Sequence, residues 1–386
     1  MLSRICLYLG AIFSALNCFA DTDLLFLPSD SSARYDQASF EKYVSDQKKW
    51  LKENRAFVTD NFELELTMNS PFEVKPQYQN SPKKGILLVH GLADSPGYFR
   101  DIANKLSKQG FLVRVILLTG HGSRPADLID VEFQTWTNLV KHHIQQLNRE
   151  VDELWLGGFS TGANLVTSYA LENEEEIAGL LLFSPGFVPD EEYAIFWASL
   201  ASIFKTWVHK NEQNGNFLRY ESLAMNAAAL YYESMKQVRE LLKIHTFDKP
   251  VLMTISQDDS VIIAEAIPPI FTKHFTHPES RLIWFGEDYQ STDKRIISMP
   301  SYLPDQQIAN FSHLSVLFSP DNPIYGKYSD YRMHDNGQDK LFYGKDRDLW
   351  FSAWGFKKKG LYFARLTWNP YFNETVDIMN QVVGSQ

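Results

Sequence analysis

Residues Gly158 to Gly162 read Gly-Phe-Ser-Thr-Gly and place a serine where it could act as a nucleophile. An apolar run at 153–157 suits a buried strand, and residues 163–171 keep the apolar spacing of a helix. A sharp strand-to-helix turn lifts a serine hydroxyl clear of the sheet, and glycines are needed there because the two backbones approach closely. The stretch predicts a nucleophile elbow at Ser160; the competing interpretation is an ordinary serine in such a turn.

A serine nucleophile needs a base, and the base needs an acid that holds it. Where an elbow of this kind is used, the acid and then the histidine follow the serine along the chain. Asp258 and Asp259 come directly after the apolar run 250–255, so both qualify as the acid by position. Further on, His313 lies in a predicted loop. The other histidines after the acid are His274, His277 and His334.

The elements that must position these residues alternate between strands and helices. Strands are expected at 85–89, 111–118, 153–157, 178–183, 250–255 and 281–285. Helices are expected at 38–57, 98–109, 131–149, 163–171 and 219–245, and an alternating half-exposed strand at 62–68. This order predicts an α/β fold with a mostly parallel central sheet flanked by helices, and ligands beyond the carboxyl ends of its strands.

Five motifs, taken together as an ordered set along the chain, resemble those of the α/β-hydrolases of the monoacylglycerol lipase and lysophospholipase type. The resemblance covers roughly residues 60–330. The motifs are the elbow, His90-Gly91, Gly120-His121-Gly122-Ser123, Asp259-Ser260-Val261-Ile262 and Ser312-His313. The resemblance implies the α/β-hydrolase fold. It also implies that the acid is Asp259 and not Asp258, and that the catalytic histidine is His313. Ser256 stands where the family usually has glycine.

The roles follow from the chemistry of such a triad. Ser160 attacks an acyl carbonyl, His313 takes its proton, and Asp259 fixes the imidazole tautomer. The oxyanion needs two backbone donors, one of them on the residue after the nucleophile, Thr161. The resemblance places the second donor on Leu92. We expect His90 and His121 to shape glycine-tight turns, and we expect no metal site.

The insertion at about 187–249 follows the strand that ends near Ser184, and it is where substrate choice is expected. Residues 191–209 predict a broadly apolar helix, and the resemblance makes the region a helical cap over an acyl pocket. A helical packing layer is the alternative. The residues expected to bind the acyl chain are Phe196, Trp197, Phe204 and Trp207.

The two ends of the chain call for separate interpretations. Residues 1–20 predict a secretory signal peptide followed by one hydrolase domain, 21–386, and hence a periplasmic or secreted protein. The alternative is a lipoprotein anchored through Cys18. An aromatic-rich segment at about 345–386 contains Lys357-Lys358-Lys359, which favours either edge-strand packing or peripheral contact with membrane lipid.

Composition narrows the function. The formal charge of −10 argues against nucleic acid as a partner, and no nucleotide-binding glycine motif is present, so no cofactor is implied. We expect a serine carboxylester hydrolase acting on acyl esters of lipids. A serine peptidase or acyltransferase on the same fold, and a non-catalytic lipid-binding protein, are the alternatives.

Overall fold

The computed structural model describes residues 24–384, except for 79–82, 191–204, 212–214 and 339–348. The predicted signal peptide and the predicted acyl-chain residues Phe196, Trp197 and Phe204 therefore lie outside the described residues. Within them, no helix is both long enough and apolar enough to cross a membrane.

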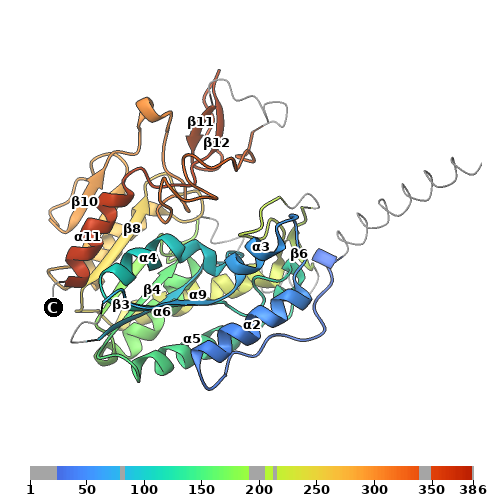
Figure 1. Ribbon diagram of the computed structural model, residues 1–386. Coiled ribbons are helices and arrows are strands. Elements are labelled where there is room, and N and C mark those ends of the chain that lie inside the picture. The colour runs from blue at the N-terminus through green and yellow to red at the C-terminus, as the bar shows by residue number, and fades with distance from the viewer. Residues whose placement is uncertain (1–23, 79–82, 191–204, 212–214, 339–348, 385–386) are drawn as a thin grey trace, which may run out of the picture.

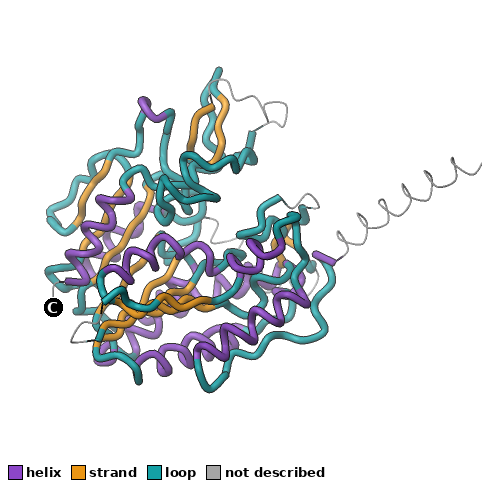
Figure 2. Tube along the Cα trace, in the orientation of Figure 1, coloured by secondary structure: helices purple, strands orange, loops and turns teal. Residues whose placement is uncertain are grey.

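An eight-stranded sheet forms the centre of the molecule (Figures 1 and 2). In spatial order its strands are β1 (Phe72–Val74), β3 (Phe111–Ile116), β2 (Lys84–Val89), β4 (Glu153–Phe159), β5 (Gly179–Phe183), β8 (Val251–Ser256), β9 (Arg281–Phe285) and β10 (Ile296–Met299). Only β1 runs antiparallel to its neighbour in this sheet. The predicted mostly parallel α/β architecture is confirmed.

Helices cover both faces of this sheet (Figure 1). The α-helices are α2 (Phe40–Asn54), α3 (Phe62–Asn69), α4 (Arg100–Lys108), α5 (Phe133–Asn148), α6 (Thr161–Glu172), α9 (Met225–Ile244), α10 (Ile267–His274) and α11 (Phe372–Gly384). Short 3-10 helices lie at Pro96–Phe99, Pro125–Leu128, Glu174–Glu176, Ala264–Ala266 and Pro304–Gln306.

Side chains that alternate along the central strands divide the core into two layers. Leu87 of β2 packs in the layer beneath α5, α6, α9 and α10, whereas its neighbour Leu88 packs in the layer beneath α4 and α11. Because both faces are covered, these strands are apolar at nearly every position, which is why the sequence pattern located them.

The predicted strand at 62–68 is wrong, because this segment is helix α3. The Asn61 side chain caps the helix by accepting a hydrogen bond from Leu64 N–H at 3.2 Å. The helix buries Leu66 and Met68 together with the charged Glu65, which pairs with buried Arg55 at 2.8 Å, while Phe62 is 57% exposed. The alternation therefore misplaced Glu65, whose buried carboxylate is compensated by its pairing with Arg55.

The insertion and the C-terminal segment contain two small sheets. In the insertion, β6 (Trp207–His209) pairs with β7 (Leu223–Ala224), so the helix predicted for 191–209 is wrong at its end, and the second helix begins only at Met225. In the C-terminal segment, β11 (Leu349–Ser352) and β12 (Tyr362–Arg365) pair outside the main sheet (Figure 1). Helix α11 then returns to pack against β8 and β9.

Candidate active site

Ser160 occupies the turn between β4 and α6 in an uncommon backbone conformation, with φ 52° and ψ −115°. Its backbone N–H donates to Phe183 O on the neighbouring strand β5 at 3.0 Å. Non-glycine residues rarely adopt positive φ, and such strain persists where the surrounding structure enforces it. The structure therefore gives Ser160 the geometry of a nucleophile elbow.

The two glycines of the elbow are required by close backbone contacts. A Cβ atom on Gly162 would lie 2.0 Å from Val89 O, and one on Gly158 would lie 2.4 Å from Ala163 N. Both distances are far below van der Waals contact, so the expected reason for these glycines is confirmed. The same contact brings α6 against the end of β2, where the His90-Gly91 loop begins.

His313 and Asp259 form a direct pair. His313 Nδ1 lies 2.6 Å from Asp259 Oδ2, and Asp259 Oδ1 accepts hydrogen bonds from the backbone N–H groups of Val261 at 2.8 Å and Ile262 at 3.2 Å. With the carboxylate as acceptor, Nδ1 carries the hydrogen and Nε2 is left to accept a proton. Asp258 is exposed and lines a different hollow, beside Gln257 and Tyr302.

A pocket of about 690 Å³ brings the predicted residues together. Ser160, Thr161, Leu92 and His313 all line it. Among the described residues, neither the backbone N–H of Leu92 nor that of Thr161 has an acceptor, and the Ser160 hydroxyl has no hydrogen-bond partner. Catalytic hydrogen bonds are often open before substrate arrives, so these groups are available to a substrate.

Trp207, the one predicted acyl-chain residue that the structure describes, does not line this pocket. Its ring packs edge-on against Phe26 at 5.1 Å, and Lys210 lies 5.4 Å from its ring centre. The prediction for Trp207 is therefore wrong, because the segment that carries it is a strand packed against the N-terminal segment and not a helix over the pocket.

Serine hydroxyls at the carboxyl ends of two strands hold the loop that carries His313. Ser184, just past β5, donates to His313 O at 2.9 Å, and Ser256, the last residue of β8, donates to Phe311 O at 2.8 Å. In the sequence, Ser256 is marked only by standing where the family usually has glycine. In the structure, its hydroxyl hydrogen-bonds the loop that carries His313 to the end of β8, the strand that precedes Asp259.

His90 and His121 brace the loop that carries Leu92. His121 Nε2 accepts a hydrogen bond from Ala93 N–H at 3.0 Å, and His90 Nε2 accepts one from Leu118 N–H at 3.1 Å. Burial lowers the pKa of His90 to about 4 and the pKa of His121 well below its usual value. Both rings are therefore neutral acceptors near neutral pH.

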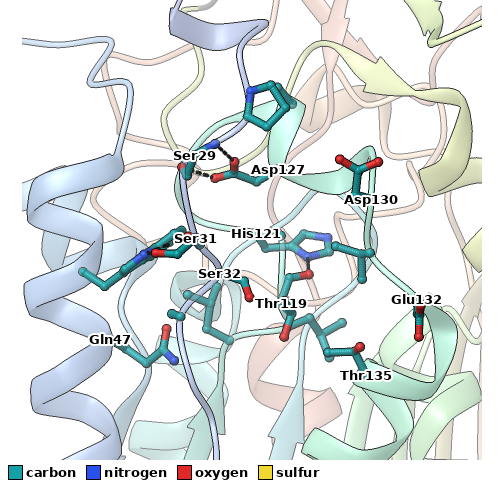
Figure 3. A pocket seen from close by; sticks show the side chains of 18 of the residues that line it. Ser29, Ser31, Ser32, Gln47, Thr119, His121, Asp127, Asp130, Glu132 and Thr135 are labelled. Carbon is teal, nitrogen blue, oxygen red and sulfur yellow. Dashed lines mark hydrogen bonds between the residues drawn. The ribbon is translucent and has the colours of Figure 1, made fainter.

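His121 is also reached from the other side by the N-terminal segment (Figure 3). A cavity of about 360 Å³ lies between this segment and the loop after β3. Ser29 donates to Asp127 through its backbone N–H at 2.6 Å and its hydroxyl at 2.9 Å, and His121 lines the same cavity (Figure 3). The N-terminal segment therefore packs against the loop that carries His121, which contacts the loop of the predicted oxyanion donor Leu92.

If His121 positions Leu92, replacing it by alanine should lower kcat about ten- to a hundredfold, because a displaced oxyanion donor stabilises the transition state less well. His121→Gln keeps an acceptor for Ala93 N–H and should lose less. Ester hydrolysis at saturating substrate measures the effect, with His277→Ala, outside the pocket, as the control. Full activity in His121→Ala would rule out this role.

The order of the main sheet, the elbow at Ser160 and the Asp259–His313 pair are features of the α/β-hydrolase fold. Residues 80–241 match the model of the hydrolase family described as serine aminopeptidase, S33.

Among characterised proteins, the chain is similar to a thermostable monoacylglycerol lipase from Bacillus sp. (strain H-257), with 30% identity over 107 residues. The match covers 28% of this chain and 42% of that protein. A metagenome-derived lipolytic enzyme matches at TM-score 0.49 and 21% identity, over 56% of this chain and 86% of its own. The monoglyceride lipase of Saccharomyces cerevisiae matches at TM-score 0.46 and 14% identity, over 59% and 85%.

Proposed function

We propose that the protein is a serine carboxylester hydrolase that cleaves acyl esters of lipids, of the monoacylglycerol lipase or lysophospholipase type, through an acyl-enzyme on Ser160. The carrying observation is the 2.6 Å contact between His313 and Asp259 in a pocket shared with an elbow serine and two unpaired backbone N–H groups. This arrangement supports the roles of nucleophile, base, acid and oxyanion donors that acyl transfer needs.

In the proposed reaction, His313 Nε2 removes the Ser160 proton while Oγ attacks the ester carbonyl. The tetrahedral oxyanion receives the N–H groups of Leu92 and Thr161, and Asp259 stabilises the imidazolium. His313 then gives the proton to the leaving alcohol, which departs and leaves the acyl-enzyme. Water then attacks the acyl-enzyme as His313 takes its proton, and His313 passes that proton to Ser160 Oγ as the C–O bond breaks, which releases the fatty acid and restores the free serine.

The lipid part of the proposal is supported by the similarity to a monoacylglycerol lipase and by the apolar side chains among those that line the pocket, such as Leu223, Val261, Leu314 and Met333. A serine peptidase or acyltransferase would use the same triad. Cleavage of an ester but not of the matching amide, with water as the acceptor, separates the three. A non-catalytic lipid-binding protein would leave Ser160 unreactive.

We also propose that the enzyme is exported, in line with residues 1–20, and that it meets lipid at a membrane surface. Trp354 lines the pocket and is 51% exposed, and Lys357, Lys358 and Lys359 follow it in the same exposed turn between β11 and β12. An aromatic ring beside cationic side chains suits the interface of an anionic bilayer. Residues 21–386 would form one hydrolase domain, with 187–249 as its cap.

A fluorophosphonate labelling assay followed by an ester chain-length series tests the proposed function. Each methylene that the pocket buries contributes about 0.8 kcal/mol, so kcat/KM should rise several-fold per two carbons until the pocket is full. Trp197→Ala and Phe204→Ala should flatten this rise for long chains only. A preference for acetate or butyrate esters would overturn the lipid part and favour a small-ester esterase.

A further inference from the structure

Two arginines share the pocket with Ser160 and His313, although they lie far apart in the sequence. Arg219 precedes β7 in the insertion, and Arg365 is the last residue of β12 in the C-terminal segment. Guanidinium groups are costly to enclose without an acceptor, because the charge loses its hydration. Whether Arg219 and Arg365 serve the fold or bind a ligand therefore depends on how many of their N–H groups already have an acceptor in the protein.

Arg219 has no hydrogen bond and no ion pair with any described residue, and its Nε is enclosed without an acceptor. Burial lowers its pKa, but interactions with Tyr98, Asp94, Tyr325 and Glu221 together raise that pKa above the usual value. Asp94 and Glu221 lie too far from it for an ion pair. The guanidinium thus stays charged and keeps its planar donor fork unused.

Asn216 adds a further unused donor beside Arg219. Its side chain is 3% exposed, and Oδ1 accepts hydrogen bonds from Leu218 N–H at 3.0 Å and from the Tyr325 hydroxyl at 2.8 Å. Because a backbone N–H can only donate, these bonds fix the amide orientation. Nδ2 is then left enclosed without an acceptor among the described residues.

Arg365 is held in place but not saturated. Its Nε donates to Asn336 Oδ1 at 2.8 Å and its Nη2 to Asp335 O at 2.9 Å, while Nη1 has no acceptor among the described residues. Burial and the neighbouring charge of Arg219 lower the pKa of Arg365 to about 9. The two cations are therefore close enough to repel each other, and a bound anion would relieve that repulsion.

The pocket also contains carboxylates, which restrict the charge that the site accepts. Asp94, Glu221 and Asp335 line it, and Glu221 Oε2 accepts a hydrogen bond from Gly215 N–H at 3.0 Å. A group with two negative charges would be repelled by these acids. A group with one negative charge shared over two oxygens can accept hydrogen bonds from the guanidinium groups of Arg219 and Arg365. It is repelled less strongly by the three carboxylates.

We propose that Arg219, Arg365 and Asn216 form a subsite for a single negative charge carried by the ester substrate, on a phosphodiester or a carboxylate. The unused donors of these three side chains, gathered in the pocket of the nucleophile, carry the assignment. This inference rests on the proposed function and deepens it. Acyl esters with a monoanionic head group are the preferred substrates, ahead of neutral monoacylglycerols.

The test compares a 1-acyl lysophosphatidylglycerol, a 1-acylglycerol carrying a succinate half-ester, and a neutral monoacylglycerol with the same acyl chain. Wild type should show higher kcat/KM on one or both anionic esters than on the neutral one. Arg219→Gln should lower that ratio about ten- to a hundredfold, mainly through KM, because a charge-assisted hydrogen bond is lost. Arg219→Lys, which keeps the charge but loses the fork, should fall between them. Arg34→Gln, an 80% exposed arginine outside the pocket, should leave the ratio unchanged.

Dimethyl phosphate, a free monoanion, separates a head-group subsite from a general anion site. It should inhibit wild type competitively and inhibit Arg219→Gln less. Inhibition without any preference among the esters would overturn the head-group assignment. An unchanged ester ratio in Arg219→Gln, with Ser160 still labelled, would overturn the subsite alone. Failure of wild type to hydrolyse all three esters, with Ser160 unlabelled, would instead overturn the proposed function.

Discussion

Replacing Ser160 by alanine should abolish covalent labelling by a fluorophosphonate and lower ester hydrolysis by about 10⁴- to 10⁶-fold, as removal of a triad nucleophile does elsewhere. The Ser160 hydroxyl is unpaired among the described residues and reaches a pocket that it shares with His313. The activity that remains is direct attack by water on the ester carbonyl. Only the oxyanion donors and His313 assist that attack, so it is slow.

The loss should be chemical and not structural. Alanine keeps the backbone strain at φ 52° and removes only the Oγ atom, so the melting temperature should stay within a few degrees of the wild-type value. Ser168→Ala is the matched control, since it removes a buried hydroxyl from the adjoining helix α6 outside the pocket. Undiminished labelling of Ser160→Ala would place the nucleophile elsewhere.

The central sheet was predictable because its strands are buried on both faces. Such strands are continuous apolar runs, as at Ile86 to Val89, and a glycine, here Gly91, marks the turn after the strand. The segment 62–68 misled for the opposite reason. Its buried side includes Glu65, which is ion-paired with Arg55, and pairing across ten residues leaves no periodic pattern.

The candidate site was predictable only in part. Ser160 and Asp259 follow the ends of β4 and β8, so the carboxyl edge of the parallel sheet gathers them. His313 lies in the loop beyond β10, and its pairing with Asp259 brings it to the same edge. The supporting serines and the arginine pair were missed, because their partners come from distant segments. Ser184 contacts the loop of His313, and Arg365 reaches the pocket from β12. No local pattern in the sequence marks such contacts.

In the C-terminal segment, too, the sequence did not reveal which residues contact distant parts of the chain. Its aromatic residues indicated packing or membrane contact without distinguishing them, and the structure gives the residues separate environments. Trp368 and Phe372 are buried in the layer beneath α11, whereas Trp354 stays exposed at the pocket. The last helix therefore belongs to the core, and the proposed membrane contact is confined to the turn between β11 and β12.

Asp259→Asn should lower kcat by about 10⁴-fold, and Asp258→Asn should leave it within about twofold of wild type, because only one of the two carboxylates orients a histidine. Asp259 Oδ2 accepts from His313 Nδ1 at 2.6 Å, while Oδ1 is already occupied by the N–H groups of Val261 and Ile262.

An asparagine at 259 must keep its single oxygen toward those two backbone donors, which turns its NH₂ toward His313. Nδ1 then becomes an acceptor, the hydrogen moves to Nε2, and the ring can no longer take the Ser160 proton. Asp258, exposed and outside the pocket, offers the matched control at the adjacent position. Steady-state kinetics on one ester, with fluorophosphonate labelling rates beside them, measure both variants. Equal losses, or a larger loss at Asp258, would mean that the Asp259–His313 contact does not orient the catalytic base.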